Sequence, residues 1–175
     1  MQRIMIIGSP GSGKSTLAKS IAQKWSLPLV HLDKLFWKAG WVEAAAEEFD
    51  QKLAQVLKGE AWVIDGNYSR TISMRLERAD AVIFLDYPRR VCMWRIFKRI
   101  AKNYGETRSD MGNGCPERVD LSFLKFVWNF QKNSRQKILA LLSEIHEKQI
   151  IIIHNKRDEQ NFFCEAEAGR KVIGE

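Results

Sequence analysis

Residues 8–15 read Gly-Ser-Pro-Gly-Ser-Gly-Lys-Ser and fit the pattern G-x-x-x-x-G-K-[ST]. Glycines let a backbone wrap closely around an anion, because they adopt positive φ and carry no side chain. The backbone amides then point inward, and the helix that follows adds the positive end of its dipole. The apolar residues 4–7 precede the motif, which gives it the strand-to-helix context that such a loop requires. The sequence therefore predicts a loop that cradles a polyphosphate.

The residue types within this loop indicate separate roles for its side chains. Lys14 supplies a mobile positive charge to the β- and γ-phosphates, and the Ser15 hydroxyl is placed to ligate Mg²⁺. Thr16 is expected at the α-phosphate. ATP with Mg²⁺ is thus the predicted cofactor. The residues of this segment that we predict to bind it are Gly8, Pro10, Gly11, Ser12, Gly13, Lys14, Ser15 and Thr16.

Apolar strand-like runs and amphipathic helix-like segments alternate along the chain of 175 residues, without a linker or an internal repeat. Continuously apolar strands that are each followed by a helix favour a parallel sheet covered on both faces. We expect a single domain over residues 1–175 with a three-layer α/β fold. The expected strands are residues 3–7, 29–32, 61–64, 81–85 and 149–153, and the expected helices are residues 14–25, 43–58, 88–103 and 121–148, with a short closing helix.

Composition narrows the class of protein and its setting. No apolar run approaches the roughly 20 residues that span a bilayer, and residues 4–7 are too short for a signal peptide. Three cysteines without a CxxC pair argue against a disulfide framework and against a zinc site. We therefore expect reduced thiols, no membrane partner and a cytoplasmic location.

Aspartate follows an apolar run at two places where a parallel strand is expected to end. Asp33 follows residues 29–32, and Asp65 follows residues 61–64. Ligands of parallel sheets bind at the carboxyl ends of the strands, where a carboxylate orients Mg²⁺ or accepts a proton from an attacking hydroxyl. Many strands also end in Asp simply to cap the next helix. We predict both residues to be catalytic, with Asp65 also a metal ligand and Asp33 also a substrate residue.

A histidine and two tryptophans lie near Asp33 in the sequence. His31 alternates with buried positions, which favours a hydrogen-bonded structural histidine over a catalyst. Trp37 and Trp41 either stack on a planar substrate or pack in the protein. We expect residues 34–60 to form the acceptor-binding segment, with Trp37 as a substrate residue.

Positive charge is concentrated between residues 89 and 108, where seven basic residues and one acidic residue supply +6 of the formal net charge of +7. Arg95 and Arg99 are four residues apart and share a face of the expected helix. Arginines stabilise the charge that spreads over a transferred phosphoryl group, so we predict both to be catalytic. Residues 104–120 contain Arg108 and several glycines, which suits a mobile lid. The alternative is a solvated basic stripe.

Several of these segments resemble adenylate kinase and shikimate kinase. They are the phosphate loop, the aspartate after the second strand, the arginine-bearing helix and residues 65–70, Asp-Gly-Asn-Tyr-Ser-Arg. The last segment is similar to the one that positions the acceptor nucleotide in adenylate kinase, with one residue more, and this implies that Arg70 binds substrate. Asp33 matches an acidic position of shikimate kinase. His31 stands where that kinase has a second Asp, so the resemblance does not extend to shikimate as the substrate.

Nearly the whole chain also resembles bacterial proteins named DNA topology modulation proteins. The resemblance implies an adenylate-kinase-like fold with a lid, a parallel sheet in the order 2-3-1-4-5 and ATP binding. Asn155 falls where related kinases place a loop against adenine, which implies a cofactor contact. The segments that carry this resemblance are residues 4–16, 31–41, 64–70, 110–117, 128–130 and 134–135.

Two functions remain open at this point. The first is a kinase that moves the γ-phosphoryl group of ATP to an unidentified small-molecule acceptor. The second is a nucleotide-dependent regulator that modulates DNA topology through a basic surface. The catalytic parts favour the kinase, because no element that reads bases is visible in the sequence. A closed site between residues 31–41 and the lid would favour the kinase, and a flat basic surface facing away from the loop would favour nucleic acid.

Overall fold

The computed structural model describes residues 1–171, and its centre is a parallel sheet of five strands. The inner strands are apolar runs that are buried on both faces, as a covered parallel sheet requires. Two further strands form a separate hairpin. When the five strands of the central sheet are numbered along the chain, their order is the expected 2-3-1-4-5, and the α/β fold is confirmed. Across the sheet the strands are β2 (Leu29–His31), β5 (Trp62–Asp65), β1 (Arg3–Gly8), β6 (Ala81–Leu85) and β7 (Gln149–Ile153).

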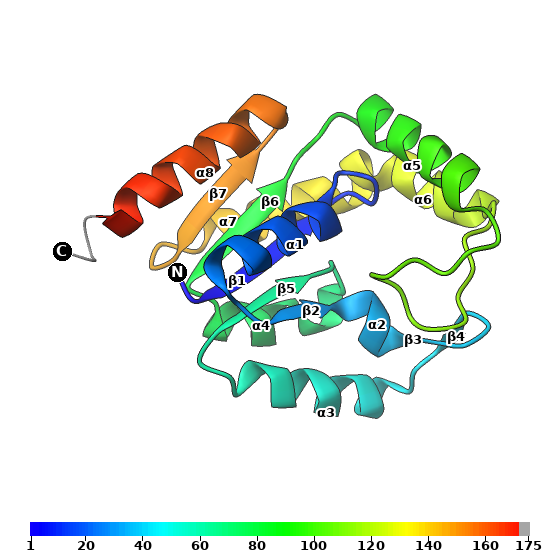
Figure 1. The fold of residues 1–175 in the computed structure, drawn as a ribbon, viewed down its shortest axis with the longest axis horizontal. Helices are drawn as coiled ribbons and strands as arrows, with labels where there is room; N and C mark the ends of the chain where they lie inside the picture. Colours follow the sequence, from blue (N-terminus) through cyan, green and yellow to red (C-terminus); the bar gives the residue numbers. More distant parts are fainter. Residues whose placement is uncertain (172–175) are drawn as a thin grey trace.

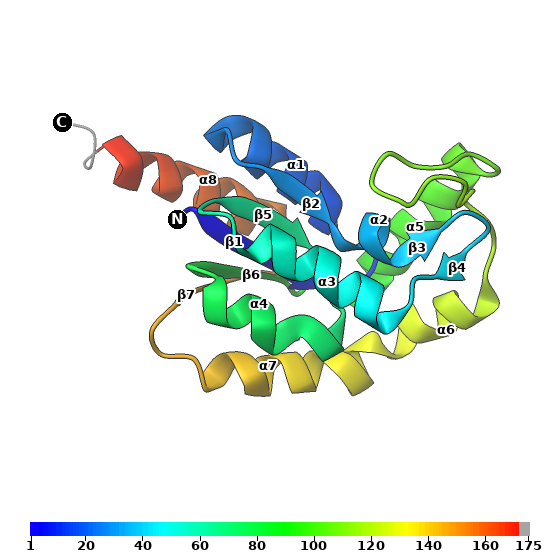
Figure 2. The same ribbon diagram turned by 90° about the horizontal axis from the view of Figure 1, so that it is seen from below.

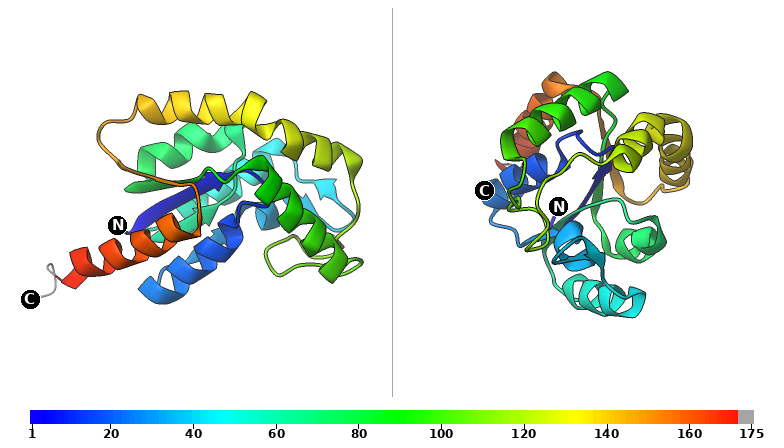
Figure 3. Two further views of the ribbon diagram at one scale, coloured as in Figure 1. Left: turned by 90° about the horizontal axis from the view of Figure 1, so that it is seen from above. Right: turned by 90° about the vertical axis from the view of Figure 1, so that its right-hand side faces the viewer.

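Helices cover both faces of this sheet (Figures 1, 2 and 3). Successive side chains of a strand point to opposite faces, so Ile4 and Ile6 of β1 pack in one core while Met5 and Ile7 pack in the other. The first core is closed by α1 (Lys14–Trp25), α5 (Arg89–Asn103) and α8 (Lys156–Lys171), and the second by α3 (Ala46–Leu57), α4 (Ile72–Arg78) and α7 (Gln136–Ser143), while α6 (Leu121–Phe130) contributes to both.

The long helix expected over residues 121–148 is interrupted and ends early. After α6 the chain forms a π-helical turn, Gln131–Arg135, and α7 then ends at Ser143. Such a turn inserts one extra residue into a helix, and the periodicity of the sequence does not reveal it. The closing helix α8 has 16 residues and is longer than expected.

The region between β2 and α3 differs most from the expectation. β2 ends at His31, so Asp33 does not end a strand but lies in the first turn of α2 (Leu32–Phe36). β3 (Trp37–Lys38) and β4 (Val42–Glu43) then form an antiparallel hairpin, and α3 consequently begins at Ala46 rather than at residue 43. Strands of two residues are too short to show an alternating pattern. The 3₁₀ turn Ser69–Thr71 and α4 were not expected either.

Residues 104–120, the expected lid, form a loop that docks on the β3–β4 hairpin (Figures 1 and 2). Trp41 Nε1 donates to Pro116 O at 3.1 Å. A Cβ added at Gly112 would lie 2.0 Å from Trp37 O, so only glycine permits the two backbones to approach this closely. The hairpin and the lid therefore meet directly, although they lie far apart in the sequence.

Arg75 on α4 is fully buried and organises the loop that follows β5. Its guanidinium donates to the carbonyl oxygens of Gly66, Asn67 and Tyr68, and its Nε donates to Thr71 O at 3.3 Å. Within residues 1–171 no carboxylate pairs with it, and burial lowers its pKa to about 10. Its contribution is therefore to satisfy buried carbonyl groups and to fix the course of this loop.

We expect Arg75→Lys to lower the free energy of unfolding by about 2–4 kcal/mol, because one ammonium group replaces a fork that satisfies several buried carbonyls. Arg78→Lys, at an exposed position of the same helix, is the matched control and should change it by less than about 0.5 kcal/mol. Urea unfolding followed by circular dichroism measures both values. Equal effects of the two substitutions would contradict the role given to Arg75.

Candidate functional site

The turn between β1 and α1 has the backbone of a phosphate-binding loop. Gly8 has a φ of 147° and Gly11 a φ of 78°, both in the region that favours glycine. A Cβ added at Gly8 would lie 2.5 Å from Leu85 O, and one at Gly11 would lie 2.4 Å from Cys92 O. The loop is therefore pressed against β6 and α5, and both glycines are required by this close approach as well as by their φ.

Lys14 folds back over this loop and forms no ion pair with any residue that the structure describes. Its Nζ donates to Gly8 O at 3.0 Å and to Ser9 O at 3.1 Å. Desolvation lowers the pKa of Lys14, and the nearby charges of Asp65 and Asp33 oppose this effect. Because no carboxylate of the described residues is hydrogen-bonded to it, a partly desolvated cation lies at the start of α1 with only carbonyl oxygens as partners.

Two further groups of the loop fit an anion. Ser12 Oγ is buried and has no hydrogen-bond partner among residues 1–171. Arg95 reaches the loop from α5, where its Nη1 donates to Ser12 O at 2.7 Å and its guanidinium stacks 4.4 Å from the centroid of the Tyr87 ring. An unsatisfied buried hydroxyl is destabilising. A phosphate oxygen that accepted from Ser12 Oγ would remove this cost, so the residues present fit a bound phosphate.

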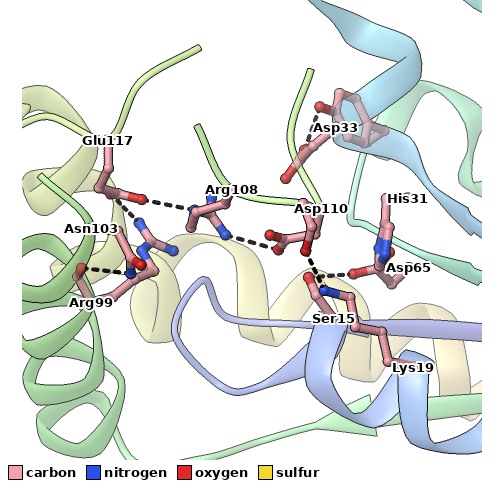
Figure 4. Close-up of polar contacts among 12 residues, drawn as sticks. Ser15, Lys19, His31, Asp33, Asp65, Arg99, Asn103, Arg108, Asp110 and Glu117 are labelled. Atoms are coloured by element: carbon pink, nitrogen blue, oxygen red, sulfur yellow. Dashed lines mark hydrogen bonds and ion pairs between the residues drawn. The ribbon is translucent and has the colours of Figure 1, made fainter. Parts of the chain in front are cut away.

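Asp65 lies buried at the end of β5, between Ser15 and His31 (Figure 4). Ser15 Oγ donates to Asp65 Oδ2 at 2.7 Å, and His31 Nδ1 lies 2.5 Å from Asp65 Oδ1. The structure thus brings together the two residues that the sequence predicted as metal ligands, and it gives His31 a hydrogen-bonded position. Hydroxyl and carboxylate oxygens are ligands that Mg²⁺ prefers, so this pair fits Mg²⁺.

Asn67 ties the loop after β5 to the phosphate loop. Gly8 N donates to Asn67 Oδ1 at 3.0 Å, and Asn67 Nδ2 donates to Gly8 O at 2.9 Å. Its amide group therefore pairs with both backbone groups of one glycine. The sequence analysis singled out residues 65–70 but missed this role, because it depends on a contact with a segment 59 positions away.

Asp33 approaches the same region from α2 (Figure 4). Tyr68 Oη donates to Asp33 Oδ1 at 2.6 Å. Desolvation raises the pKa of Asp33 against the opposing effects of this hydrogen bond and of Lys14. Tyr68 also has a φ of 33°, a strained value for a residue other than glycine, and functional sites often store such strain. The sequence analysis missed Tyr68, because neither its strain nor its long-range contact leaves a local pattern.

The lid brings arginines and carboxylates to the site (Figure 4). Arg99 on α5 donates to Glu117 Oε1 at 2.9 Å, and Arg108 contacts both Glu117 Oε2 and Asp110 Oδ2 at 2.8 Å. Burial raises the pKa of Asp110. The charge of Arg108 and a hydrogen bond from the Ser15 hydroxyl together outweigh this effect, so the pKa lies below its ordinary value. Arg99, one of the two arginines predicted to be catalytic, is therefore held by Glu117, and Arg108 is held by Glu117 and Asp110. The sequence did not indicate either of these carboxylates.

Three other predicted residues lie in surroundings that the sequence did not indicate. Arg70 is exposed, and its guanidinium donates two hydrogen bonds to Asp50 on α3, at 2.5 and 2.8 Å. Asn155 Oδ1 accepts from two backbone amides at the start of α8, so its side chain caps that helix. Trp37 packs edge-on against Trp41, with ring centroids 5.5 Å apart. In the described part of the chain, none of the three forms a hydrogen bond, an ion pair or a ring contact with a phosphate-loop side chain.

An open cavity of about 620 Å³ lies at the ends of β6 and β7, and no residue of the phosphate loop lines it. Within it, Arg135 binds Asp86 through two hydrogen bonds of 2.7 and 2.8 Å.

The three cysteines, Cys92, Cys115 and Cys164, are free thiols. Within residues 1–171 no helix combines the length and apolar character needed to cross a membrane. No three His, Cys, Asp or Glu of this part of the chain gather as a metal-binding group.

The chain shares sequence features with known nucleotide-binding proteins. A protein-family model described as ATPase family associated with various cellular activities (AAA) matches residues 4–87. The chain is 33% identical over 92 residues to adenylate kinase of Pseudothermotoga lettingae, which covers 51% of this chain and 41% of that protein. It is 28% identical over 109 residues to adenylate kinase of Clavibacter michiganensis, covering 61% and 53% respectively. The chain thus spans about half the length of the curated relatives it matches.

A solved structure supports the fold over nearly the whole chain. Shikimate kinase from Bacteroides thetaiotaomicron superposes with a TM-score of 0.55 at 18% identity, covering 97% of this chain and 98% of that one. At this identity the likeness shows the fold alone. The fold is therefore a kinase-like P-loop fold, whereas the resemblance to DNA topology modulation proteins stays a prediction.

Folding raises the pKa of Asp33, so the folded protein holds this proton more tightly than the unfolded chain does. Stability is then lost as the pH rises from the ordinary pKa of about 3.9 through the raised value. We expect Asp33→Asn to melt like the wild type below about pH 4 and at a higher temperature than the wild type near pH 7.

Asp80→Asn is the matched control. Although burial opposes the shift, hydrogen bonds from Gln2 and Arg3 lower the pKa of Asp80, so its charge stabilises the fold. This substitution should lower the melting temperature near pH 7, and differential scanning calorimetry across the pH range measures both. A wild type that is more stable than Asp33→Asn at neutral pH would contradict the desolvation of this carboxylate.

Proposed function

We propose that this chain binds ATP with Mg²⁺ and transfers its γ-phosphoryl group to a hydroxyl group of a small molecule. The single observation that carries this proposal is the partly desolvated Lys14 ammonium, which has only carbonyl partners and lies beside the unsatisfied hydroxyl of Ser12. Such a pair stabilises a polyphosphate strongly, because a cation and a donor without an anionic partner both gain from its binding. Both residues lie within residues 4–87, which the AAA family model matches, and the sequence similarity to adenylate kinase covers 51% of the chain.

Each group at the site has a role in this reaction. The loop amides and Lys14 bind the β- and γ-phosphates, and Thr16 contacts the α-phosphate. Ser15 and Asp65 would hold Mg²⁺, which neutralises charge on the phosphate oxygens when bound. Arg95 and Arg99 stabilise the charge of the moving phosphoryl group. Asn155 belongs to the loop that we propose to lie against adenine, with its backbone as the contact.

Asp33 and Asp65 divide the two tasks of a carboxylate at such a site. Both oxygens of Asp65 are engaged, one by Ser15 and one by His31, which suits a fixed position beside the metal. Among the described residues only Tyr68 donates to Asp33, at Oδ1, and the raised pKa of Asp33 suits a proton acceptor. We therefore assign proton removal from the acceptor hydroxyl to Asp33.

The contact of the lid with the hairpin favours the kinase over a DNA-binding regulator. The lid covers the side of the site formed by residues 37–41, which is the closed arrangement that phosphoryl transfer needs to exclude water. Arg95, Arg99 and Arg108 all face the loop or the lid carboxylates rather than an open basic surface. A small-molecule partner and a cytoplasmic location are parts of this proposal.

We expect Lys14→Ala to lower the rate of ADP formation from ATP by at least about 100-fold. The substitution removes the positive charge that stabilises the phosphoryl group during its transfer. The melting temperature should stay within a few degrees of the wild type. Lys137→Ala, at an exposed position on α7, is the control and should leave the rate unchanged. A Lys14→Ala protein that keeps its full rate would contradict the site assignment.

A further inference from the structure

Three cations of the acceptor-binding segment and its surroundings, Arg70, Lys38 and Arg75, are already engaged. Arg70 is bound to Asp50, and Lys38 forms an ion pair of 2.5 Å with Glu48. Arg75 is buried under backbone carbonyls. An acceptor with a phosphate or carboxylate needs a cation that is available to pair with it. On this side of the site, these three cations do not supply one.

Three arginines on the opposite side are also paired. Arg99 and Arg108 both bind Glu117, whose side chain is only 5% exposed. Drawing both arginines away would leave a buried carboxylate without a counter-charge, which is strongly destabilising. Arg135 is held by Asp86 in a two-bond arrangement outside the phosphate loop. These arginines are therefore committed to the protein's own carboxylates while the lid is docked.

The side of the site where the acceptor molecule would bind instead offers a carboxylate oxygen that can accept a hydrogen bond. Asp33 Oδ1 is bound by Tyr68, whereas no described residue donates to Oδ2. Asp65 and Asp110 add further negative charge from β5 and the lid (Figure 4). Like charges repel strongly where water is excluded. A hydroxyl or ammonium group would donate to Oδ2, whereas an acceptor anion placed there would be repelled.

A row of aromatic rings connects this carboxylate to the hairpin. Ring centroids are 4.9 Å apart between Tyr68 and Phe36, 5.0 Å between Phe36 and Trp37, and 5.5 Å between Trp37 and Trp41. Phe36, Trp37 and Trp41 are all partly exposed. Partly exposed aromatic faces suit a ligand that has a planar or apolar ring face.

From these contacts we infer that the acceptor is an uncharged or positively charged ring compound with hydroxyl groups, such as a nucleoside or an amino sugar, and carries no phosphate or carboxylate. This inference rests on the proposed function. Asp33 and Tyr68 select the acceptor through its hydroxyl groups. In the transfer step, the acceptor oxygen forms a bond to the γ-phosphorus while the bond to the β–γ bridging oxygen breaks. ADP leaves, and the hydroxyl proton passes to Asp33 Oδ2.

The test compares matched acceptors that differ in charge. Full-length protein with ATP and Mg²⁺ is given adenosine or AMP, thymidine or its 5′-monophosphate, glucosamine or its 6-phosphate, and methyl shikimate or shikimate. ADP release is measured against the rate without an acceptor. We expect at least one uncharged or cationic compound to raise the rate about tenfold or more, with a kcat/KM about tenfold or more above that of its anionic counterpart.

Substitutions separate recognition from structural support. Asp33→Asn should lower kcat/KM for the preferred compound and also reduce the ratio between the two members of its pair, because the repelling charge is gone. A merely structural defect would lower both members and leave this ratio unchanged. Lys34→Ala, an exposed neighbour on α2, is the control and should not change the ratio. A fall in the use of anionic acceptors on Lys34→Ala would contradict the inference.

Three results would overturn this inference. The first is a higher kcat/KM for the phosphorylated or carboxylated compound of each pair. The second is a kcat/KM ratio within the pair that Asp33→Asn leaves unchanged. The third is no acceleration by any compound while slow, Lys14-dependent ADP release continues. In all three results the proposed ATP site would stand. Failure of the proposed function looks different, since ATP binding would then be the same in the wild type and in Lys14→Ala, as measured by isothermal titration calorimetry.

Discussion

A positive charge that is hydrogen-bonded to no carboxylate of the described residues is the constraint on which this structure depends. The ammonium group of Lys14 is partly desolvated and rests on the carbonyl oxygens of Gly8 and Ser9, which are weaker partners than a carboxylate or phosphate. The surroundings keep the loop in this arrangement. Gly8 packs closely against Leu85 O, and the Asn67 side-chain amide forms hydrogen bonds with both the N–H and the carbonyl oxygen of Gly8. Within residues 1–171 the fold thus holds a cation that has carbonyl oxygens but no carboxylate as hydrogen-bond partners.

The elements around this loop bring different chemistry to it from distant parts of the chain. The loop after β5 carries Asn67 and Tyr68 and is fixed from beneath by the buried Arg75. Through Tyr68, this loop also positions Asp33 on α2. One buried arginine therefore supports the loop that contacts both Gly8 and Asp33. Rigid support of this kind is what keeps a strained residue such as Tyr68 in place.

The sequence predicted the parts of the site that local patterns encode, and missed those that depend on tertiary contacts. The phosphate loop and the placing of Ser15 and Asp65 at one site follow from motif and strand ends, and the strand order was implied by the family resemblance. Asp33 was placed at the end of a strand, because an apolar run alone does not show that the chain turns into a short helix after His31. Arg70 was chosen by resemblance, although Arg75 is the arginine that the loop after β5 encloses.

The most direct measurement of the central claim is a crystal structure of the protein with Mg²⁺ and a non-hydrolysable ATP analogue. The account predicts that Lys14 Nζ leaves the carbonyls of Gly8 and Ser9 for the β- and γ-phosphates, and that Ser12 Oγ donates to a phosphate oxygen. A structure in which the analogue binds elsewhere, with Lys14 still on both carbonyls, would contradict it.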